Sequence, residues 1–223
     1  MKKFPITIVD NFYETPNLVR NFALSCDWTK TDGAWPGQRT QQLSVIDSDF
    51  FNLFSSKLIS LFYDFDKSAV EWSIDTSFQK VSCFSSKKED IKNDGWIHAD
   101  NCIFSGVIYL NPNPKPGWGT SIYSLKPGEE KELQQELKFD HYLGKEIDEK
   151  EYELQKRSNN DKFVETVRIN NVYNRLILFE GGEYHGVPTF YSDESEERLT
   201  QVFFVNALNS QDPYPIVRSK LRY

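Results

Sequence analysis

The stretch that decides the fold reads Trp96-Ile97-His98-Ala99-Asp100, and the apolar run Ser105-Gly106-Val107-Ile108-Tyr109-Leu110-Asn111 follows it closely. The chain has only three histidines, and His98 stands two residues before Asp100. In an extended strand, residues i and i+2 point to the same face. A nitrogen of His98 and an oxygen of Asp100 can therefore reach the same point in space. We predict that they supply two of the ligands of a metal site.

A second strand-like segment, residues 176–179, leads through Glu180-Gly181-Gly182-Glu183-Tyr184 to another histidine, His185. Two histidines and one carboxylate, with coordination positions left open, form the facial triad of non-haem Fe(II) oxygenases. We therefore predict that His98, Asp100 and His185 bind one metal ion and form the catalytic centre.

The apolar strand that follows opens with Arg198 and Thr200, which share one face at i and i+2. The order of His-x-Asp, a distant histidine, and an arginine with a hydroxyl residue two positions later resembles the Fe(II)/2-oxoglutarate-dependent dioxygenases. Within them it is most similar to the prolyl-4-hydroxylase-like branch. The Tyr109-Leu110-Asn111 strand and the Gly119-Thr120 turn add to this likeness, which covers about residues 80–206. The resemblance implies a double-stranded β-helix, or jelly roll, with the metal between two sheets near one open end.

The resemblance also implies roles for residues around the metal. In that family, 2-oxoglutarate occupies two of the open metal positions, and its far carboxylate binds an arginine inside the barrel. We assign this arginine to Arg198 and expect Tyr109 and Thr200 to add hydroxyl donors. Because the loop from His185 to Arg198 is long for the pattern, Arg175 is the alternative arginine.

The implied activity is that of an enzyme, a dioxygenase that hydroxylates its substrate and releases succinate and CO₂. Fe(II) and 2-oxoglutarate are its expected cofactor and co-substrate, and ascorbate is a candidate reductant. The substrate is a prolyl side chain of a peptide, a free amino acid or another small metabolite. Two alternatives remain open: a cupin-like metal enzyme that does not use 2-oxoglutarate, and a catalytically silent binding domain on the same fold.

Other residues offer alternatives within the site. Glu180 and Glu183 flank His185 and could replace Asp100 as the carboxylate ligand, although the paired spacing of His-x-Asp favours Asp100. The third histidine, His141, has no ligand-like neighbour in the sequence, so we interpret it as a surface or packing residue.

The composition limits the class of protein. With 223 residues, of which 39% are apolar, the chain suits one domain over residues 1–223 with a large core. It contains no run of about 18 apolar residues, so we expect no membrane span. The net charge of −7, with no basic cluster larger than Lys87-Lys88, argues against a nucleic-acid partner. The three cysteines are widely spaced and match neither a disulfide framework nor a zinc motif, which favours the cytoplasm.

The sequence predicts a mainly β core with helices at its front. We expect a strand in residues 4–9, a helix opened by Thr15-Pro16 and a second helix capped by Ser48, whose apolar stripe ends at Phe65. Further strands are expected over residues 72–84, 119–123, 163–167, 175–179 and 199–206.

Two segments interrupt this pattern. The polar, turn-rich residues 29–41 form either a surface connection with Trp35 against the core or a loop that faces the substrate. Residues 127–162 are dominated by charged side chains, and we expect one or two solvated helices inserted between strands. This insertion is also a candidate for bordering the mouth of the active site or for the contact of a homodimer.

Overall fold

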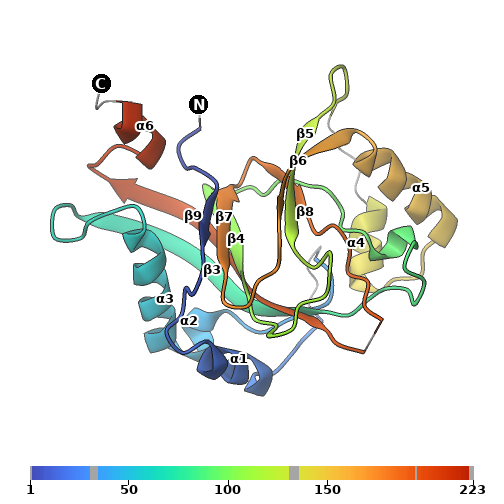
Figure 1. Ribbon diagram of the computed structural model, residues 1–223, viewed down its shortest axis with the longest axis horizontal. Helices are drawn as coiled ribbons and strands as arrows, with labels where there is room; N and C mark the ends of the chain where they lie inside the picture. Colours follow the sequence, from blue (N-terminus) through green and yellow to red (C-terminus); the bar gives the residue numbers. More distant parts are fainter. Residues whose placement is uncertain (1, 31–34, 131–135, 194, 221–223) are drawn as a thin grey trace.

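The computed structural model describes residues 2–30, 35–130, 136–193 and 195–220 (Figure 1). Two antiparallel sheets form its centre, with strand orders β1-β7-β4-β9-β3-β2 and β6-β5-β8. The larger sheet contains β1 (Thr7–Val9), β2 (Gln38–Arg39), β3 (Val70–Val81), β4 (Phe104–Tyr109), β7 (Leu176–Glu180) and β9 (Arg198–Ser210). The smaller sheet contains β5 (Thr120–Leu125), β6 (Phe163–Ile169) and β8 (Tyr184–Gly186). The prediction of a mainly β protein with added helices is confirmed.

Side-chain alternation gives the larger sheet two different faces. In β4, Phe104 is buried in the main apolar cluster, whereas its neighbour Ser105 lines a cavity on the opposite face. In β9, Phe203 belongs to the same cluster, whereas Phe204 lines the cavity. Successive residues of a strand point to opposite faces, so each strand contributes both to the core and to the cavity.

Three N-terminal helices cover the apolar face of the larger sheet (Figure 1). They are α1 (Pro16–Ser25), the short α2 (Leu43–Ile46) and α3 (Ser48–Ser60). The ring centroids of Phe54 on α3 and Phe203 on β9 lie 5.7 Å apart, as do those of Phe22 on α1 and Phe78 on β3. Aromatic pairs at such distances bury large apolar areas, and they fix the helices against the sheet.

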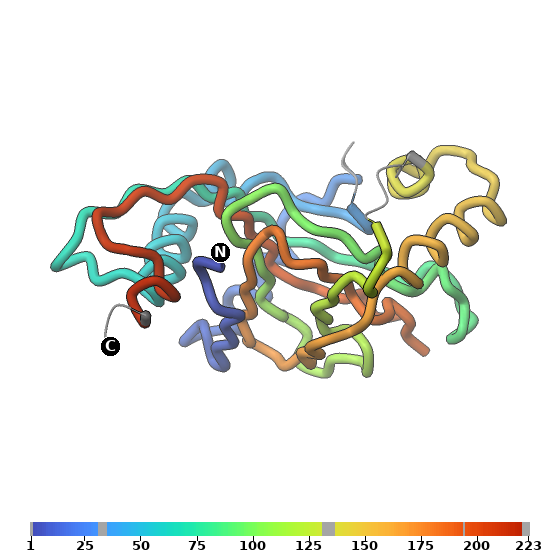
Figure 2. Tube along the Cα trace, turned by 90° about the horizontal axis from the view of Figure 1, so that it is seen from above, coloured from blue at the N-terminus to red at the C-terminus, as the bar shows by residue number. Residues whose placement is uncertain are grey.

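Two further helices, α4 (Glu136–Leu143) and α5 (Glu149–Asn160), lie between β5 and β6 in the chain. A short 3-10 helix, η1 (Ile91–Asn93), contacts α5. Seen from above, α4 and α5 lie at the opposite end of the molecule from the C-terminal segment, which carries α6 (Pro215–Lys220) (Figure 2).

The N-terminus of α3 differs from the prediction. Its N-cap is Asp47, whose carboxylate accepts a hydrogen bond from the backbone N–H of Phe50 (2.9 Å). Ser48 is the first residue inside the helix, so the expectation that Ser48 caps it is wrong. The helix also ends before Phe65, the last residue of the predicted stripe, which instead stacks on Trp72 with ring centroids 5.5 Å apart.

Parts of two predicted segments lie outside the described residues. These are residues 31–34 of the predicted loop 29–41 and residues 131–135 of the predicted insertion 127–162. None of the helices in the described parts of the chain combines the length and apolar character needed to span a lipid bilayer.

We predict that Phe54→Ala lowers the free energy of unfolding by about 3–5 kcal/mol, because it removes a large side chain from a packed core. Phe54 is 1% exposed, whereas its neighbour Leu53 on the same helix is 72% exposed. Leu53→Ala is therefore the matched control and should change the stability by no more than about 0.5 kcal/mol. Urea unfolding, monitored by circular dichroism, measures the free energy of unfolding of both variants. Equal effects of the two substitutions would contradict the packing of α3 described above.

Candidate metal centre

The site begins with a pair of backbone hydrogen bonds between His98 and His185. The N–H of His98 donates to the carbonyl of His185 (3.0 Å), and the N–H of His185 donates to the carbonyl of His98 (2.8 Å). Residues that exchange both hydrogen bonds in this way stand directly opposite each other, with their side chains on the same face. The two imidazole rings consequently lie with their centroids 4.4 Å apart.

Each imidazole is oriented by a backbone carbonyl two residues earlier in the chain. Nδ1 of His98 lies 2.8 Å from the carbonyl oxygen of Trp96, and Nδ1 of His185 lies 3.0 Å from that of Glu183. A carbonyl only accepts hydrogen bonds, so Nδ1 carries the proton in both rings. Nε2 of each ring is then left with a lone pair, which is the form of histidine that binds a metal.

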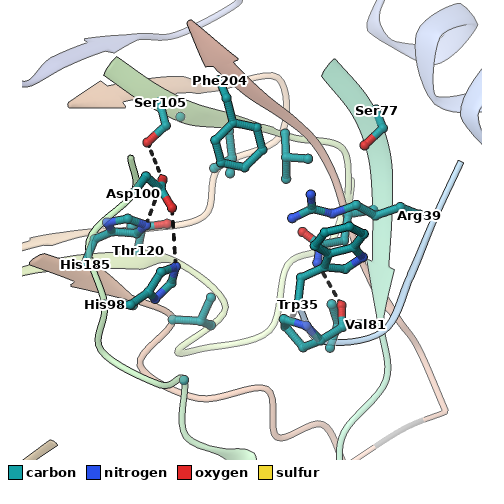
Figure 3. Close-up of a pocket in the computed structure, with 18 of the residues that line it drawn as sticks. Trp35, Arg39, Ser77, Val81, His98, Asp100, Ser105, Thr120, His185 and Phe204 are labelled. Carbon is teal, nitrogen blue, oxygen red and sulfur yellow. Dashed lines mark hydrogen bonds and ion pairs between the residues drawn. The ribbon is translucent and has the colours of Figure 1, made fainter. Parts of the chain in front are cut away.

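Asp100 completes the cluster from the same segment as His98 (Figure 3). Its carboxylate oxygens lie 3.7 Å from Nε2 of His98 and 3.5 Å from Nε2 of His185. Ser105 donates a hydrogen bond of 2.6 Å to the carboxylate of Asp100, which holds it in place. The ligand atoms of the three residues all lie within 4.8 Å of one another, a spacing that one metal ion can bridge.

The backbone of Asp100 is held by a close approach to the turn after β7. Its N–H donates to the carbonyl of Gly181 (2.7 Å). A Cβ atom at position 181 would lie 2.3 Å from the carbonyl oxygen of Cys102, so only glycine fits there. Gly181 therefore allows the segment that carries Asp100 to approach the turn that leads to His185.

Burial lowers the pKa of His98 well below its usual value, and the nearby imidazole of His185 and the cations Lys138 and Arg39 lower it further. A lowered pKa keeps the imidazole neutral at physiological pH, and a neutral imidazole is required for coordination. Two imidazoles and one carboxylate match the donor set of the facial Fe(II) triad, so these residues fit such an ion.

The three ligand atoms face a cavity of about 580 Å³. Both sheets and α4 contribute to its wall. Its size is within the range of about 300–1,000 Å³ found for small-molecule sites. Figure 3 shows the His98, Asp100 and His185 side chains on one side of the cavity, with Trp35 and Arg39 on the other.

Arg198 lines the same cavity and is 3% exposed. Its Nε donates to the carbonyl of Trp118 (2.7 Å), and its guanidinium lies 5.5 Å from the ring centroid of Tyr109. Within the described chain, no carboxylate forms an ion pair with Arg198. A buried guanidinium without an acidic partner is costly, and it is a natural binding site for the carboxylate of a ligand.

The two other predicted co-substrate residues lie behind the cavity wall. Tyr109 donates a hydrogen bond of 2.9 Å to the hydroxyl of Thr120, and Thr120 rather than Tyr109 lines the cavity. Thr200 pairs with Tyr109 across β4 and β9, and its buried hydroxyl has no hydrogen-bond partner. The orphaned hydroxyl of Thr200 beside Arg198 marks a polar site that the described chain leaves incomplete.

The alternative residues of the sequence analysis have other partners. Arg175 forms an ion pair of 2.5 Å with Asp10 and does not line the cavity. Glu180 accepts a hydrogen bond from the backbone N–H of Phe4 (2.8 Å). The remaining glutamate of that turn, Glu183, pairs with Lys2 (2.5 Å). None of these three side chains belongs to the cluster around His98.

The third histidine, His141, lies away from the cluster. Its ring stacks on Tyr152 with centroids 4.1 Å apart, in the contact between α4 and α5. Burial lowers the pKa of His141 to about 4. It packs between helices, as the sequence analysis expects.

Helix α5 supports the segment that carries His98. At the end of α5, Asn160 accepts a hydrogen bond from the N–H of Ile97 (3.1 Å) and donates one to the carbonyl of Gly95 (2.9 Å). Its neighbour Asn159 donates to the carbonyl of Ile97 (3.0 Å). The two asparagines thus replace a neighbouring strand for residues 95–97.

Sequence reasoning missed Ser105, Asn159 and Asn160. Ser105 stands in the apolar run after the His-x-Asp pair, at a position that faces the cavity, and a polar residue there was a usable signal. The paired asparagines stand in a charged helical segment, where nothing in the sequence distinguishes them from solvated residues.

Comparison with known families gives a match over residues 1–205 to a family of unknown function, DUF6445. The chain belongs to this family. No curated protein matches the sequence.

Solved structures show which fold this DUF6445 member has. HygX from Streptomyces hygroscopicus with nickel, 2-oxoglutarate and hygromycin B bound is 11% identical, with a TM-score of 0.54, over 92% of this chain and 83% of that chain. Its structure with nickel and 2-oxoglutarate bound is 12% identical, with a TM-score of 0.51, over 92% and 83% of the two chains. A prolyl-4-hydroxylase from Pseudomonas putida is 16% identical over 90% of this chain and 91% of that chain, with a TM-score of 0.43. The similarity to HygX shows a shared fold.

We predict that His185→Ala weakens the binding of Mn(II) at pH 7 by at least about 100-fold, because it removes one of three ligands. His141→Ala is the matched control, since it removes a histidine that packs between α4 and α5. Isothermal titration calorimetry with MnCl₂ measures both affinities. Unchanged binding in His185→Ala would show that the metal is held elsewhere.

We predict that Asn160→Ala weakens Mn(II) binding by about tenfold, because the backbone that positions His98 loses two hydrogen bonds. Asn160→Asp keeps the acceptor for Ile97 and loses only the donor to Gly95, so its affinity should lie between those of the wild type and Asn160→Ala. The exposed Asn209 at the end of β9 offers a control, Asn209→Ala, with unchanged affinity. A wild-type affinity in Asn160→Ala would contradict a positioning role for α5.

Proposed function

We propose that this protein is an Fe(II)- and 2-oxoglutarate-dependent dioxygenase. It hydroxylates a small molecule or a peptide and releases succinate and CO₂. The observation that carries this proposal is that His98, Asp100 and His185 converge in one cavity with the unpaired guanidinium of Arg198. The fold of HygX, whose structures hold nickel and 2-oxoglutarate, supports it further. The proposal includes a double-stranded β-helix as the core of a single domain over residues 1–223, with α4 and α5 as its insertion.

In this proposal, Fe(II) is held by Nε2 of His98, Nε2 of His185 and the carboxylate of Asp100. Bound iron would supply the oxidative chemistry, in which 2-oxoglutarate is decarboxylated and the substrate gains a hydroxyl group. The protein keeps both Nδ1 atoms protonated against backbone carbonyls, which directs the lone pairs toward the ion. Ser105 holds the Asp100 carboxylate in one orientation through its 2.6 Å hydrogen bond.

Arg198 is our candidate for binding the far carboxylate of 2-oxoglutarate. Its planar guanidinium can donate two parallel hydrogen bonds to a carboxylate. Tyr109, which donates to Thr120 of the cavity wall, and Thr200, whose hydroxyl has no hydrogen-bond partner among the described residues, are our candidates for additional hydroxyl donors. Arg175 is a poorer candidate because it is already paired with Asp10.

The cavity also provides the shielding that such chemistry needs. Val107, Phe179 and Val202 contribute apolar surface to its wall. An apolar wall excludes water and strengthens the electrostatic interactions of Arg198 with an anion. We place the protein in the cytoplasm, a reducing compartment in which Cys26, Cys83 and Cys102 would stay reduced.

We predict that the purified protein forms succinate slowly when supplied with Fe(II), ascorbate, oxygen and 2-oxoglutarate, even without its primary substrate. His98→Ala should abolish this reaction. Arg198→Ala should raise the required 2-oxoglutarate concentration by about 10- to 100-fold, the loss expected for a charge-assisted hydrogen-bonded pair. Succinate is measured by mass spectrometry.

Arg168→Ala is the control for the arginine substitution, because Arg168 pairs with Glu165 on the surface of β6. If the protein binds metal and neither forms succinate nor binds 2-oxoglutarate, the cupin-like alternative replaces our proposal. If the protein binds no metal, the alternative of a catalytically silent binding domain replaces our proposal.

A further inference from the structure

The far side of the cavity holds a second arginine, Arg39, which the proposed chemistry at the metal does not use. Figure 3 shows its guanidinium directed into the cavity and facing the side that carries Asp100. The guanidinium carbon lies 4.2 Å from the ring centroid of Trp35 and 5.5 Å from that of Phe204. Stacking on aromatic faces leaves the N–H donors at the edge of the guanidinium free for a ligand.

Arg39 has no acidic partner among the described residues. Its Nε is buried without a hydrogen-bond partner, and no carboxylate of the described chain lies within ion-pair distance. Asp75, which also lines the cavity, is exposed and accepts a hydrogen bond from Asn206 (2.8 Å). Burial lowers the pKa of Arg39 to about 10, which leaves it charged at neutral pH. A buried and unpaired cation of this kind is costly unless an anion joins it.

The backbone holds Arg39 rigidly at this position. It pairs with Gln79 of β3 on one side and exchanges two backbone hydrogen bonds with Thr29 on the other (3.0 and 3.1 Å). Gln79 also donates to the carbonyl of Pro36 (2.7 Å), which fixes the segment that carries Trp35. A binding group on paired strands is preorganised for its ligand.

A second cation, Lys138 on α4, contributes to the same cavity. It is 6% exposed, and burial lowers its pKa to about 8. The charges of both Lys138 and Arg39 act on His98, so both lie close enough to influence the metal side of the cavity.

The described part of the wall carries charged side chains of both signs. Among the described lining residues, Arg39, Lys138 and Arg198 are cationic, and Asp75 and Asp100 are anionic. A divalent metal ion and the dianion 2-oxoglutarate neutralise each other, so their binding does not supply an anion for Arg39. Arg198 serves the co-substrate in our proposed function, and Arg39 is left to meet a third ligand.

We propose that the primary substrate is a small organic oxyanion, a carboxylate or a phosphate, and that Arg39 binds its anionic group. The substrate then extends across the cavity, with its anionic end at Arg39 and Trp35 and its reacting carbon toward the metal. The reaction of this substrate rests on the proposed function. The anion site itself is inferred from the burial of Arg39, its aromatic contacts and the lack of an acidic partner among the described residues.

The turnover experiment uses matched sets of small molecules: carboxylic acids, the amides of the same acids, and phosphate esters of similar size. Succinate formation above the substrate-free rate is the readout. We expect acids or phosphate esters to stimulate the reaction and the amides to fail. The more effective of the two anionic sets identifies the group. Arg39→Gln should require at least about tenfold more of a stimulating anion, as expected for loss of a charge-assisted hydrogen bond.

A binding experiment separates this inference from the proposed function. Calorimetry with 3-phenylpropionate, 3-phenylpropanamide and phenyl phosphate is performed on metal-free protein and on protein loaded with Mn(II) and 2-oxoglutarate. Anion binding that is at least about tenfold weaker in Arg39→Gln, in either form, supports the site even if no succinate is ever formed. Arg39→Lys should retain part of the affinity, and Arg168→Gln on the surface of β6 is the matched control. Thermal unfolding checks that each variant is folded.

Three results would overturn the inference while leaving the metal centre intact. The first is equal stimulation or binding by acids and their amides. The second is stimulation and binding by anions that are equal in Arg39→Gln and the wild type, or a wild-type protein that is neither stimulated by nor binds any of the anions tested. The third is a loss of 2-oxoglutarate binding in Arg39→Gln, which would assign Arg39 to the co-substrate.

Discussion

Two backbone hydrogen bonds between His98 and His185 determine the geometry of the candidate centre. They join segments that are far apart in the chain, and they place both imidazole rings on the same face. A further backbone bond, from Asp100 to Gly181, joins the same two segments and brings the carboxylate to the rings. The relative positions of the three side chains thus follow from backbone pairing, which gives a metal site the rigidity it needs.

The larger sheet supplies the support for this pairing. Its strands β4 and β9 bury aromatic side chains against the N-terminal helices on one face and present Ser105, Arg198 and Phe204 to the cavity on the other. A packed core resists small displacements, so residues on the opposite face of the same strands are held in place. Helix α5 also supports the site, because its Asn159 and Asn160 form hydrogen bonds to the backbone of residues 95–97 in place of a neighbouring strand.

Much of this arrangement could be predicted from sequence patterns. Alternation and apolar runs indicated most strands, and the i, i+2 spacing of His98 and Asp100 predicted that their side chains approach each other, as they do. Their role as metal ligands stays a prediction. Asp47 was missed because two adjacent residues, Asp47 and Ser48, can both cap a helix, and only the backbone conformation chooses between them. Lys138 could not be predicted, because its burial depends on how α4 packs against the cavity.

The role of Arg39 could not be predicted from the sequence either. From the sequence, residues 29–41 were either a surface connection or a loop that faces the substrate. In the structure, Trp35 and Arg39 of this loop line the wall of the cavity. What identifies Arg39 is the absence of an acidic partner among the described residues around it, a property of three-dimensional packing that no sequence window contains.

The central claim is that His98, Asp100 and His185 hold one ion beside a pocket for an organic acid that ends at Arg198. Its most direct test is a crystal structure grown with Mn(II) and 2-oxoglutarate, with anomalous scattering used to locate the manganese. We predict a single peak in contact with Nε2 of both histidines and the Asp100 carboxylate, and electron density for 2-oxoglutarate that reaches Arg198. A metal bound elsewhere, or three side chains that remain without an ion at saturating Mn(II), would contradict the account.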